Sequence, residues 1–255
     1  MMKDVLECYD RAKQPLFLQS GVKRMIRWEQ LPDSMKNKTL RPYYDKLKKK
    51  KFSLCMKRIM DLLFAVVLTV VLAPVMAVLG LWIKLDSRGP VFYRQERITR
   101  YGKPYRIFKF RTMVADADQK GPLVTGKADS RITRAGKMLR KCRLDELPQL
   151  FNVLTGDMSF VGTRPEVRKY VEQYTDEMMA TLLLPAGITS RTSIIFKDED
   201  LMMEKYLRET GKSVDEVYVD HILPVKMKHN LQYLQNFHFW GDIRVMIDTV
   251  LAVIK

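Results

Sequence analysis

The hydrophobic pattern of the chain is dominated by one stretch, Leu62 to Ile83, which contains 22 residues and no charged side chain. As an α-helix this stretch would be roughly 33 Å long, about the thickness of the hydrocarbon core of a bilayer. Pro74 falls near its middle, where a proline removes a backbone hydrogen bond and bends a helix. The pattern therefore predicts a bent membrane helix.

Basic residues crowd both flanks of this stretch and bear on its topology. They are Lys48 to Lys51, Lys57 and Arg58 before it, and Lys84, Arg88, Arg94, Arg97 and Arg100 after it. Under the positive-inside rule, both flanks favour the cytoplasm. We therefore expect a re-entrant helix that enters the membrane, bends at Ala73-Pro74 and returns, in preference to a helix that crosses the bilayer. A buried core helix of a soluble protein is the third interpretation.

Two shorter segments follow, Val91 to Arg97 and Tyr105 to Phe110, joined by a turn around Tyr101 to Pro104. Their β-branched and aromatic residues and the turn between them predict a β-hairpin. Lysines and arginines are interleaved with aromatic residues along it. Such a surface suits the stacking of nucleobases as well as contact with lipid head groups.

The remaining pattern is mainly helical. Helices are expected at about 130–141, 145–154, 165–174, 176–183, 200–209, 214–236 with an interruption at Pro224, and 241–254. The last of them has an apolar face that can pack on the core or lie at the bilayer surface. For the polar, basic residues 1–56, loose helices and a partly disordered tail fit equally well. We predict a mostly α fold with a small β-hairpin.

Composition and charge restrict the partners. The chain has 255 residues, of which 47% are hydrophobic, and a net charge of +16, so it folds and is attracted to nucleic acid, anionic lipid or phosphorylated substrates. Cys8, Cys55 and Cys142 fit neither a CxxC metal site nor a disulfide framework, and we interpret them as reduced cytoplasmic thiols. The sequence contains no GxxxxGK[ST] or GxGxxG motif, which removes the common nucleotide-binding loops.

Candidate chemistry is concentrated between residues 140 and 166. Three carboxylates lie there among three arginines, namely Asp145, Glu146 and Asp157 with Arg140, Arg143 and Arg164. Such a set can hold a divalent metal and a diphosphate together. The structural alternative is that Asp145 is a helix N-cap and Glu146 complements the helix dipole. In the functional interpretation, the same helix end keeps Asp145 ionised and nucleophilic. Asp157 can instead cap the next segment, and Arg143 can be a surface residue.

Four motifs occur in order along the chain. They are Lys57-Arg58-Ile59-Met60-Asp61; Gly89-Pro90-Val91-Phe92 with Phe108-Lys109-Phe110-Arg111-Thr112-Met113; Arg143 to Leu154 (RLDELPQLFNVL); and Gly156 to Gly162 (GDMSFVG). Through them, roughly four-fifths of the chain resembles the bacterial sugar transferases, the monotopic phosphoglycosyl transferases that load a sugar phosphate onto a polyprenyl-phosphate carrier.

The resemblance implies a covalent, two-step reaction on a nucleotide-diphosphate sugar, usually a UDP-sugar. Asp145 matches the nucleophile that releases UMP and forms an aspartyl-phosphosugar ester, which polyprenyl (undecaprenyl) phosphate then attacks. Glu146 matches the partner that holds Mg²⁺ together with Asp145. The residues that would bind substrate phosphates are Arg140, Arg164 and Lys197. Further candidates are Asp157, Arg143 and Arg111.

The chain departs from the family pattern in three places. Thr163-Arg164-Pro165 stands where Pro-Arg-Pro is common, and Ala73-Pro74 stands where Ser-Pro is common. We expect the bend to survive on the proline alone. The third departure is Pro185 to Ser193, which replaces a common Pro-Gly-Ile-Thr-Gly-Trp run. We expect this loop to bear on the donor, so the sugar cannot be inferred from better-known relatives.

The predicted organisation has three regions: a basic N-terminal extension (1–56), the re-entrant membrane helix (57–88) and a cytosolic and interfacial catalytic domain (89–255). The resemblance implies a bacterial inner-membrane protein with its catalytic domain on the cytoplasmic face, which initiates membrane glycan assembly (exopolysaccharide, capsule, O-antigen or glycoprotein glycan). Its partners would be a nucleotide-sugar donor, polyprenyl phosphate and membrane lipids, without nucleic acid, and homo-oligomer formation stays open. The competing hypotheses are a non-enzymatic membrane-anchored module that binds polyanions and a metal-dependent hydrolase of nucleotide sugars.

Overall fold

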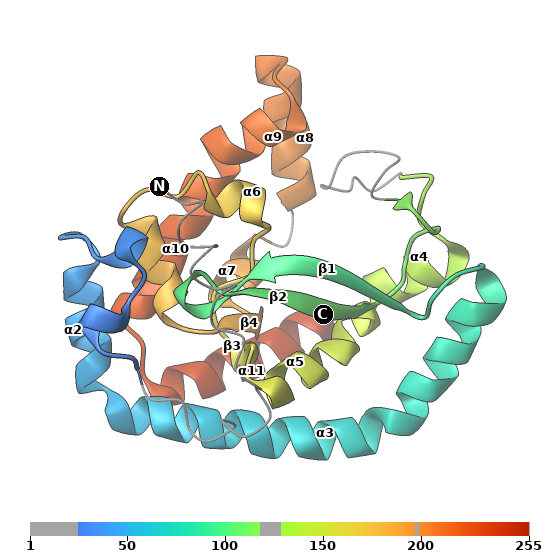
Figure 1. Cartoon of the computed structure of the whole chain (residues 1–255). Coiled ribbons are helices and arrows are strands. Elements are labelled where there is room, and N and C mark those ends of the chain that lie inside the picture. The colour runs from blue at the N-terminus through green and yellow to red at the C-terminus, as the bar shows by residue number, and fades with distance from the viewer. Residues whose placement is uncertain (1–24, 118–128, 197–198, 255) are drawn as a thin grey trace.

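The structure, a computed structural model, describes residues 25–117, 129–196 and 199–254. Helices make up most of it, as the sequence predicts, and two small sheets complete the fold (Figure 1). The helices are α2 (Arg41–Lys49), α3 (Lys51–Asp86), α4 (Arg134–Lys141), α5 (Leu150–Thr155), α6 (Arg168–Val171), α7 (Arg191–Ile195), α8 (Glu199–Thr210), α9 (Val214–Val217), α10 (Leu223–Gln235) and α11 (Phe239–Ile254). The strands are β1 (Phe92–Ile98), β2 (Pro104–Phe110), β3 (Met158–Val161) and β4 (Ala186–Thr189).

The uncharged stretch forms the middle of α3, a helix of 36 residues that begins before the predicted membrane region. Figure 1 shows α3 running along one side of the molecule and changing direction near the C-terminal end of the helix. Pro74 lies inside this helix. Because proline lacks an N–H group and its ring crowds the carbonyl one turn earlier, the change of direction has a local cause in the sequence.

The predicted hairpin is confirmed. Strands β1 and β2 pair antiparallel, with Phe92 opposite Phe110 and Arg94 opposite Phe108. Side chains alternate between the two faces of a strand, so these four residues share one face while Lys109 lies on the other. On the aromatic face, the Arg94 guanidinium lies 3.4 Å from the ring centre of Phe108. The hairpin thus separates the face that carries Phe92, Phe108 and Phe110 from the face that carries Lys109.

A second, parallel sheet is formed by β3 and β4, with Met158 opposite Ala186. The sequence predicts turns and a loop here, because strands of four residues, largely buried, show no alternation that would reveal them. Two glycines allow the backbones to meet just beyond β3. A Cβ atom on Gly187 would lie 2.2 Å from the Gly162 nitrogen, so a residue with a side chain does not fit at this position.

Residues 25–50 pack against the rest of the chain. Leu31 and Leu47 are buried in the same hydrophobic cluster as Leu183 and Phe237. The helical interpretation therefore fits this part of the N-terminal extension, whereas residues 1–24 lie outside the described residues. The segment forms part of the core on which the hairpin turn and α10 also rest.

The C-terminal half is helical but less regular than the sequence predicts. The helix expected at 165–174 is reduced to α6, and the one at 176–183 is the 3₁₀ helix Met178–Leu183. From α9 through a π turn, Tyr218–Ile222, to α10, the chain stays helical, and Pro224 lies in the first turn of α10. The proline, which lacks an N–H group, lies just after the π turn, and the helical segment continues past it.

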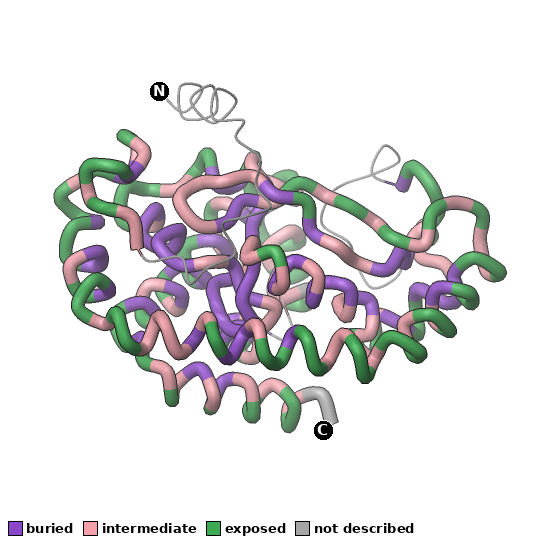
Figure 2. Tube along the Cα trace, turned by 60° about the horizontal axis from the view of Figure 1, so that its bottom comes forward, coloured by how far each residue is buried: buried purple, intermediate pink, exposed green. Residues whose placement is uncertain are grey.

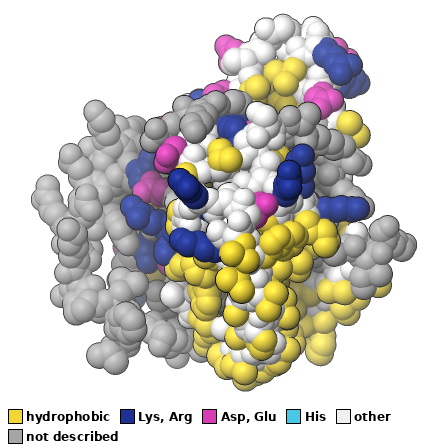
Figure 3. Space-filling model, turned by 90° about the vertical axis from the view of Figure 1, so that its right-hand side faces the viewer, with side chains coloured by type: hydrophobic (Ala, Val, Ile, Leu, Met, Phe, Trp, Pro, Cys, Tyr) yellow, Lys and Arg dark blue, Asp and Glu magenta, His cyan; other side chains and the backbone are white. Residues whose placement is uncertain are grey.

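Helices α3 and α11 are in contact and expose many large apolar side chains. These are Phe52, Ile59, Leu63, Phe64, Val66, Val67, Val70, Val71, Val75, Val78, Leu81, Trp82 and Leu85 on α3, and Trp240, Ile247, Val250 and Leu251 on α11. Figure 2 shows the buried residues gathered in the interior, and Figure 3 shows hydrophobic side chains collected at one end of the molecule with lysines and arginines directly above them. A surface of this extent and composition is typical of contact with a membrane or another apolar partner.

Candidate active site

Asp145 and Glu146 lie in the 3₁₀ helix Leu144–Gln149, between α4 and α5. Arg143 precedes this helix in the left-handed conformation, with φ 56°, and no side chain caps the helix. Asp145 is therefore not the N-cap, because it is the second residue of the helix, two positions after Arg143. Its side chain is nevertheless nearly buried, since the residue is only 8% exposed.

Two cations from distant parts of the chain hold the acidic pair. The Lys109 ammonium on β2 lies 2.8 Å from Glu146 Oε1 and 4.0 Å from Asp145 Oδ2. The Arg164 guanidinium, after β3, lies 3.5 Å from the same Glu146 oxygen. Arg164 was predicted from the sequence, but Lys109 was not singled out among the many basic residues of the hairpin. The signal that distinguishes it is alternation, which puts Lys109 on the face opposite Phe108.

The pKa values of the two carboxyl groups move in opposite directions. Burial raises the pKa of Asp145, and Lys109 partly offsets the rise. Burial also opposes ionisation of Glu146, but the charges of Lys109 and Arg164 prevail and lower its pKa to about 2. The surrounding cations thus favour the ionised form of Glu146, while Asp145 is a poorly solvated carboxylate, a state that favours nucleophilic attack.

Arg140 and Arg143 add positive charge beside the pair. Both lower the pKa of Asp145, although Arg143 is exposed. The Nε atom of Arg140 donates to Thr112 Oγ1 at 2.9 Å. Helix α4, which carries Arg140, lies against the end of the hairpin because Gly136 has no side chain; a Cβ atom there would lie 2.0 Å from the Thr112 carbonyl oxygen. The predicted arginines at 140, 143 and 164 therefore surround the acidic pair.

Asp157, the third predicted carboxylate, has partners of its own. Its side chain accepts a hydrogen bond of 2.9 Å from Thr155 Oγ1 and lies 3.6 Å from the Lys103 ammonium. None of its described hydrogen bonds or ion pairs reaches Asp145 or Glu146. These contacts hold Asp157 in the turn between α5 and β3, whereas the structural alternative expected it to cap the segment that follows.

Arg111 binds the end of the long helix. Its guanidinium donates to the backbone oxygens of Ser87 and Arg88 at 2.7 and 2.8 Å, which satisfies carbonyl groups at and just after the C-terminus of α3. Among the described contacts, Arg111 joins α3 to β2 and does not reach the acidic pair. Lys197, the last predicted phosphate ligand, lies outside the described residues.

The sequence did not predict a buried polar network that lies two residues after Arg164, around Glu166. Glu166 accepts hydrogen bonds from the Tyr218 hydroxyl at 2.7 Å and from the Lys226 ammonium at 3.2 Å. Lys226 also lies 3.4 Å from Glu199. The charges of Glu166 and Glu199, after that of Glu146, raise the pKa of Arg164. The network thus connects α8 and α10 to the segment that carries Arg164.

The donor set permits a divalent cation but does not form a complete cage. Among the described residues, no group of three or more His, Cys, Asp and Glu side chains could hold a metal ion. Asp145 and Glu146 provide two neighbouring carboxylates, and Mg²⁺ commonly binds one or two carboxylates together with substrate phosphates and water. The residues present therefore fit a cation that enters with its phosphate ligand.

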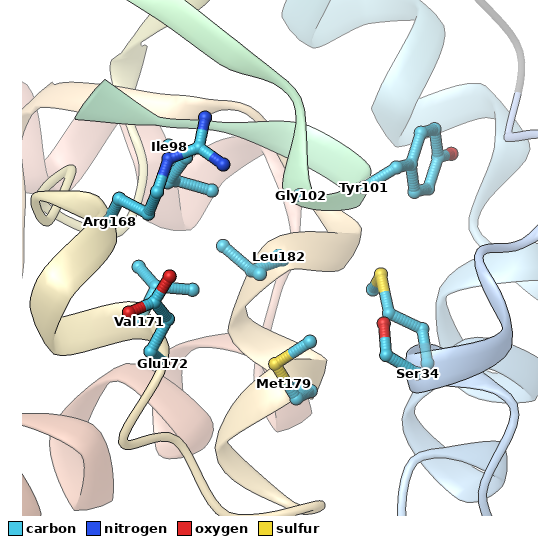
Figure 4. A pocket seen from close by; sticks show the side chains of 10 residues that line it. Ser34, Ile98, Tyr101, Gly102, Arg168, Val171, Glu172, Met179 and Leu182 are labelled. Atoms are coloured by element: carbon cyan, nitrogen blue, oxygen red, sulfur yellow. The ribbon is translucent and has the colours of Figure 1, made fainter. Parts of the chain in front are cut away.

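One cavity of the described structure lies elsewhere. It has a volume of about 20 Å³ and lies where the hairpin turn meets the N-terminal segment and the 3₁₀ helix Met178–Leu183. Figure 4 shows Arg168 and Glu172 on one side of it and Tyr101 and Ser34 on the other. A space of this size holds about one water molecule, so it is a packing gap and has no part in the candidate site.

Known proteins are similar in sequence to this chain. The model of the bacterial sugar transferase family matches residues 52–255. A UDP-N-acetylgalactosamine-undecaprenyl-phosphate N-acetylgalactosaminephosphotransferase of Aeromonas hydrophila is 34% identical over 201 residues, which are 78% of this chain and 43% of that protein. A UDP-glucose:undecaprenyl-phosphate glucose-1-phosphate transferase of Caulobacter vibrioides is 32% identical over 201 residues, or 78% of this chain and 69% of that protein.

A third relative, the UDP-glucose:undecaprenyl-phosphate glucose-1-phosphate transferase of Escherichia coli, is 33% identical over 199 residues, which are 76% of this chain and 39% of that protein. The chain thus spans less than half the length of two of these relatives. In each of the three, the match covers about three quarters of the present chain. Together with the match over residues 52–255, these similarities show that the chain belongs to the bacterial sugar transferase family.

Proposed function

We propose that this protein transfers a sugar 1-phosphate from a UDP-sugar to undecaprenyl phosphate and so initiates the assembly of a membrane glycan. The observation that carries the proposal is the pair Asp145 and Glu146, nearly buried and held between Lys109 and Arg164. The relatives named above supply the substrate classes, since their names specify a UDP-sugar donor and undecaprenyl phosphate.

The reaction divides into two displacements at the same phosphorus. In the first, an Asp145 carboxylate oxygen forms a bond to the sugar-bearing phosphorus, and the bond from that phosphorus to the bridging oxygen breaks, so UMP leaves with the electron pair. In the second, a phosphate oxygen of undecaprenyl phosphate attacks the same phosphorus and the Asp145 carboxylate leaves unchanged. Splitting the transfer lets a water-soluble donor and a lipid acceptor use one site in turn.

The fixed charges fit the demands of these steps. Arg164 and Lys109 would stabilise negative charge on the non-bridging oxygens, as guanidinium and ammonium groups do at phosphate sites. Glu146, ionised throughout, would hold Mg²⁺ together with Asp145. That cation, when bound, neutralises charge on the departing phosphate. Arg140, held by Thr112, would orient the diphosphate beside the nucleophile.

The length, composition and exposure of α3, together with the apolar face of α11, support a membrane placement. Within the described chain, α3 is the one helix long and apolar enough to cross a membrane, and only 11% of its most apolar window is buried inside the protein. A core helix of a soluble protein would be mostly covered, so this low burial opposes that interpretation. We propose that α3 lies in the cytoplasmic leaflet of the bacterial inner membrane, with α11 at its surface and the catalytic residues on the cytoplasmic side.

A re-entrant path explains why both ends of α3 rest on the same body of the protein. Near its start, the Lys57 ammonium binds Asp242 of α11 at 2.6 Å. At its end, Asp86 accepts a hydrogen bond of 3.0 Å from the backbone N–H of Ala135 in α4. A helix that crossed the bilayer would place these two ends on opposite sides, so the contacts favour a helix that bends at Pro74 and returns.

Release of UMP from a panel of UDP-sugars tests the function. With the purified full chain, we expect multiple turnovers only when undecaprenyl phosphate is present, together with a lipid-linked product. Without the acceptor, a covalent mechanism limits release to a burst of about one UMP per enzyme. Continuous UMP release without the acceptor, giving water-soluble sugar phosphate, would identify a hydrolase. A chain that releases no UMP with any of the sugars would contradict the proposed reaction.

The acid side of the pH profile tests the role of Lys109. Asp145 must be ionised to attack, so activity should fall as the pH drops through its pKa, which burial raises and Lys109 lowers. Replacing Lys109 with Met removes the lowering charge. We therefore expect the acidic limb of kcat to move to higher pH and kcat to fall by about 10²-fold, while Lys109→Arg keeps the limb near its original position. An unchanged limb in Lys109→Met would show that Lys109 does not act on Asp145.

A further inference from the structure

A cluster of exposed lysines marks the corner where α2 turns into α3 (Figure 1). The exposed lysines are Lys46, Lys48, Lys49 and Lys51, and none of them forms an ion pair with another described residue. No aspartate or glutamate occurs between residues 46 and 60. The corner therefore presents positive charge that no acidic side chain of its own segment neutralises.

Large apolar rings lie beside these charges. Phe52 is 78% exposed at the start of α3, and Trp240 is 73% exposed in the first turn of α11. Lys50 donates a hydrogen bond to the backbone oxygen of Phe237, which holds the beginning of α11 next to the α2–α3 corner. Aromatic rings next to basic side chains are typical of the boundary between lipid head groups and acyl chains.

From this combination, we propose that the corner formed by the four exposed lysines, Phe52 and Trp240 binds anionic phospholipid head groups and enriches them around the protein. The inference rests on the proposed membrane placement and adds to it a preferred head group and the residues that select it. Lysines at a membrane surface gain about fivefold in binding each from negatively charged lipid.

The geometry favours a lipid over a nucleic acid. The lysines directly precede the apolar surface of α3, so their charge lies at the edge of the surface proposed to enter the membrane, at the level where lipid phosphates lie. A nucleic acid would need no exposed Phe52 or Trp240 beside its phosphates. The corner is also separate from the catalytic centre, because Leu144 and Leu147, in the 3₁₀ helix that carries Asp145, belong to the same hydrophobic cluster as Met76 and Leu79 in the second half of α3.

Quenching of Trp240 by brominated lipids can test the proposal. The full chain, with Trp28 and Trp82 replaced by Phe, is reconstituted in phosphatidylcholine vesicles that contain about a tenth of brominated lipid. We expect brominated phosphatidylglycerol to quench Trp240 more than brominated phosphatidylcholine does at the same fraction, with a relative association about fivefold or more in favour of the anionic lipid. High salt should reduce this preference, because it screens surface charge.

The decisive variant replaces Lys46, Lys48, Lys49 and Lys51 with Gln, and its matched control replaces four exposed lysines elsewhere, Lys36, Lys38, Lys205 and Lys228, with Gln. The preference should vanish in the first variant and persist in the second and in a version with Arg at the four corner positions. If the two brominated lipids quenched Trp240 equally in the protein that keeps all four corner lysines, in vesicles where it still releases UMP, the inference would be overturned and the proposed function would stand. Failure of the protein to enter vesicles at all would contradict the membrane placement itself. If added DNA at moderate salt abolished the preference for anionic lipid, the corner would be a general polyanion site and the proposal of a lipid site would be wrong.

Discussion

Replacing Asp145 with Asn is expected to abolish sugar-phosphate transfer, with a fall in kcat on the order of 10⁴-fold or more, while the fold persists. The amide keeps the size of the carboxyl group but has no anionic oxygen to attack phosphorus. Stability should change little, because burial already raises the pKa of Asp145 and so disfavours its charged form. UMP release and thermal unfolding of the variant measure the two expectations.

Covalent labelling makes this prediction specific. After brief exposure to a donor labelled in its sugar and without acceptor, the native chain should retain label through acid quenching, and Asp145→Asn should not. Asp215→Asn is the matched control, since Asp215 is a surface carboxylate paired with Lys169 at 2.5 Å, and it should keep both label and activity. Retention of label by Asp145→Asn would assign the ester to another residue.

The parts of the fold that could be predicted are those with a strong local pattern. The apolar stretch of α3 predicts a long helix, and the basic and aromatic residues of β1 and β2 predict a hairpin, each from a segment of about twenty residues. Strands β3 and β4 could not be found in this way, because each is four residues long and each needs a partner from elsewhere in the chain. Their pairing depends on Gly162 and Gly187 meeting in space, which no local pattern reveals.

The candidate site shows the same division. Asp145, Glu146 and Arg164 were predicted because carboxylates lie among arginines between residues 140 and 166, and the resemblance to a known family then assigned their roles. Strand alternation assigns Lys109 to the face opposite Phe108. Its contact with the acidic pair arises because the hairpin folds over the 3₁₀ helix that carries Asp145 and Glu146, and alternation alone does not reveal that contact. Conversely, Arg111 belongs to a motif but binds the carbonyls at the end of α3. A motif residue thus indicates a location in the fold more reliably than it indicates a chemical role.

The first turns of α3 are the least like a membrane helix, and this bears on topology. The Lys57 ammonium donates to the Val161 carbonyl oxygen at 2.6 Å, and Asp61 accepts hydrogen bonds from Ser159 Oγ at 3.1 Å and from the Phe160 backbone at 3.0 Å. These charged groups are buried against β3. Separating a buried ion pair or leaving one partner uncompensated costs about 3–5 kcal/mol. A path through the bilayer that detached this end of α3 from the catalytic body would incur that cost.

Cysteine accessibility in intact cells is therefore expected to show both flanks of α3 on the cytoplasmic side. In a chain with Cys8, Cys55 and Cys142 replaced by Ser, single cysteines at Asp45 and at Ala115 should both resist an impermeant thiol reagent and both react once the cells are permeabilised. The reason is that α3, roughly 54 Å long as a straight helix, has its two ends anchored to one body through Lys57 and Arg111. Labelling of the Asp45→Cys chain alone in intact cells would show a helix that crosses the membrane, and the contacts of Lys57 with β3 and α11 would then have to be absent from the inserted protein.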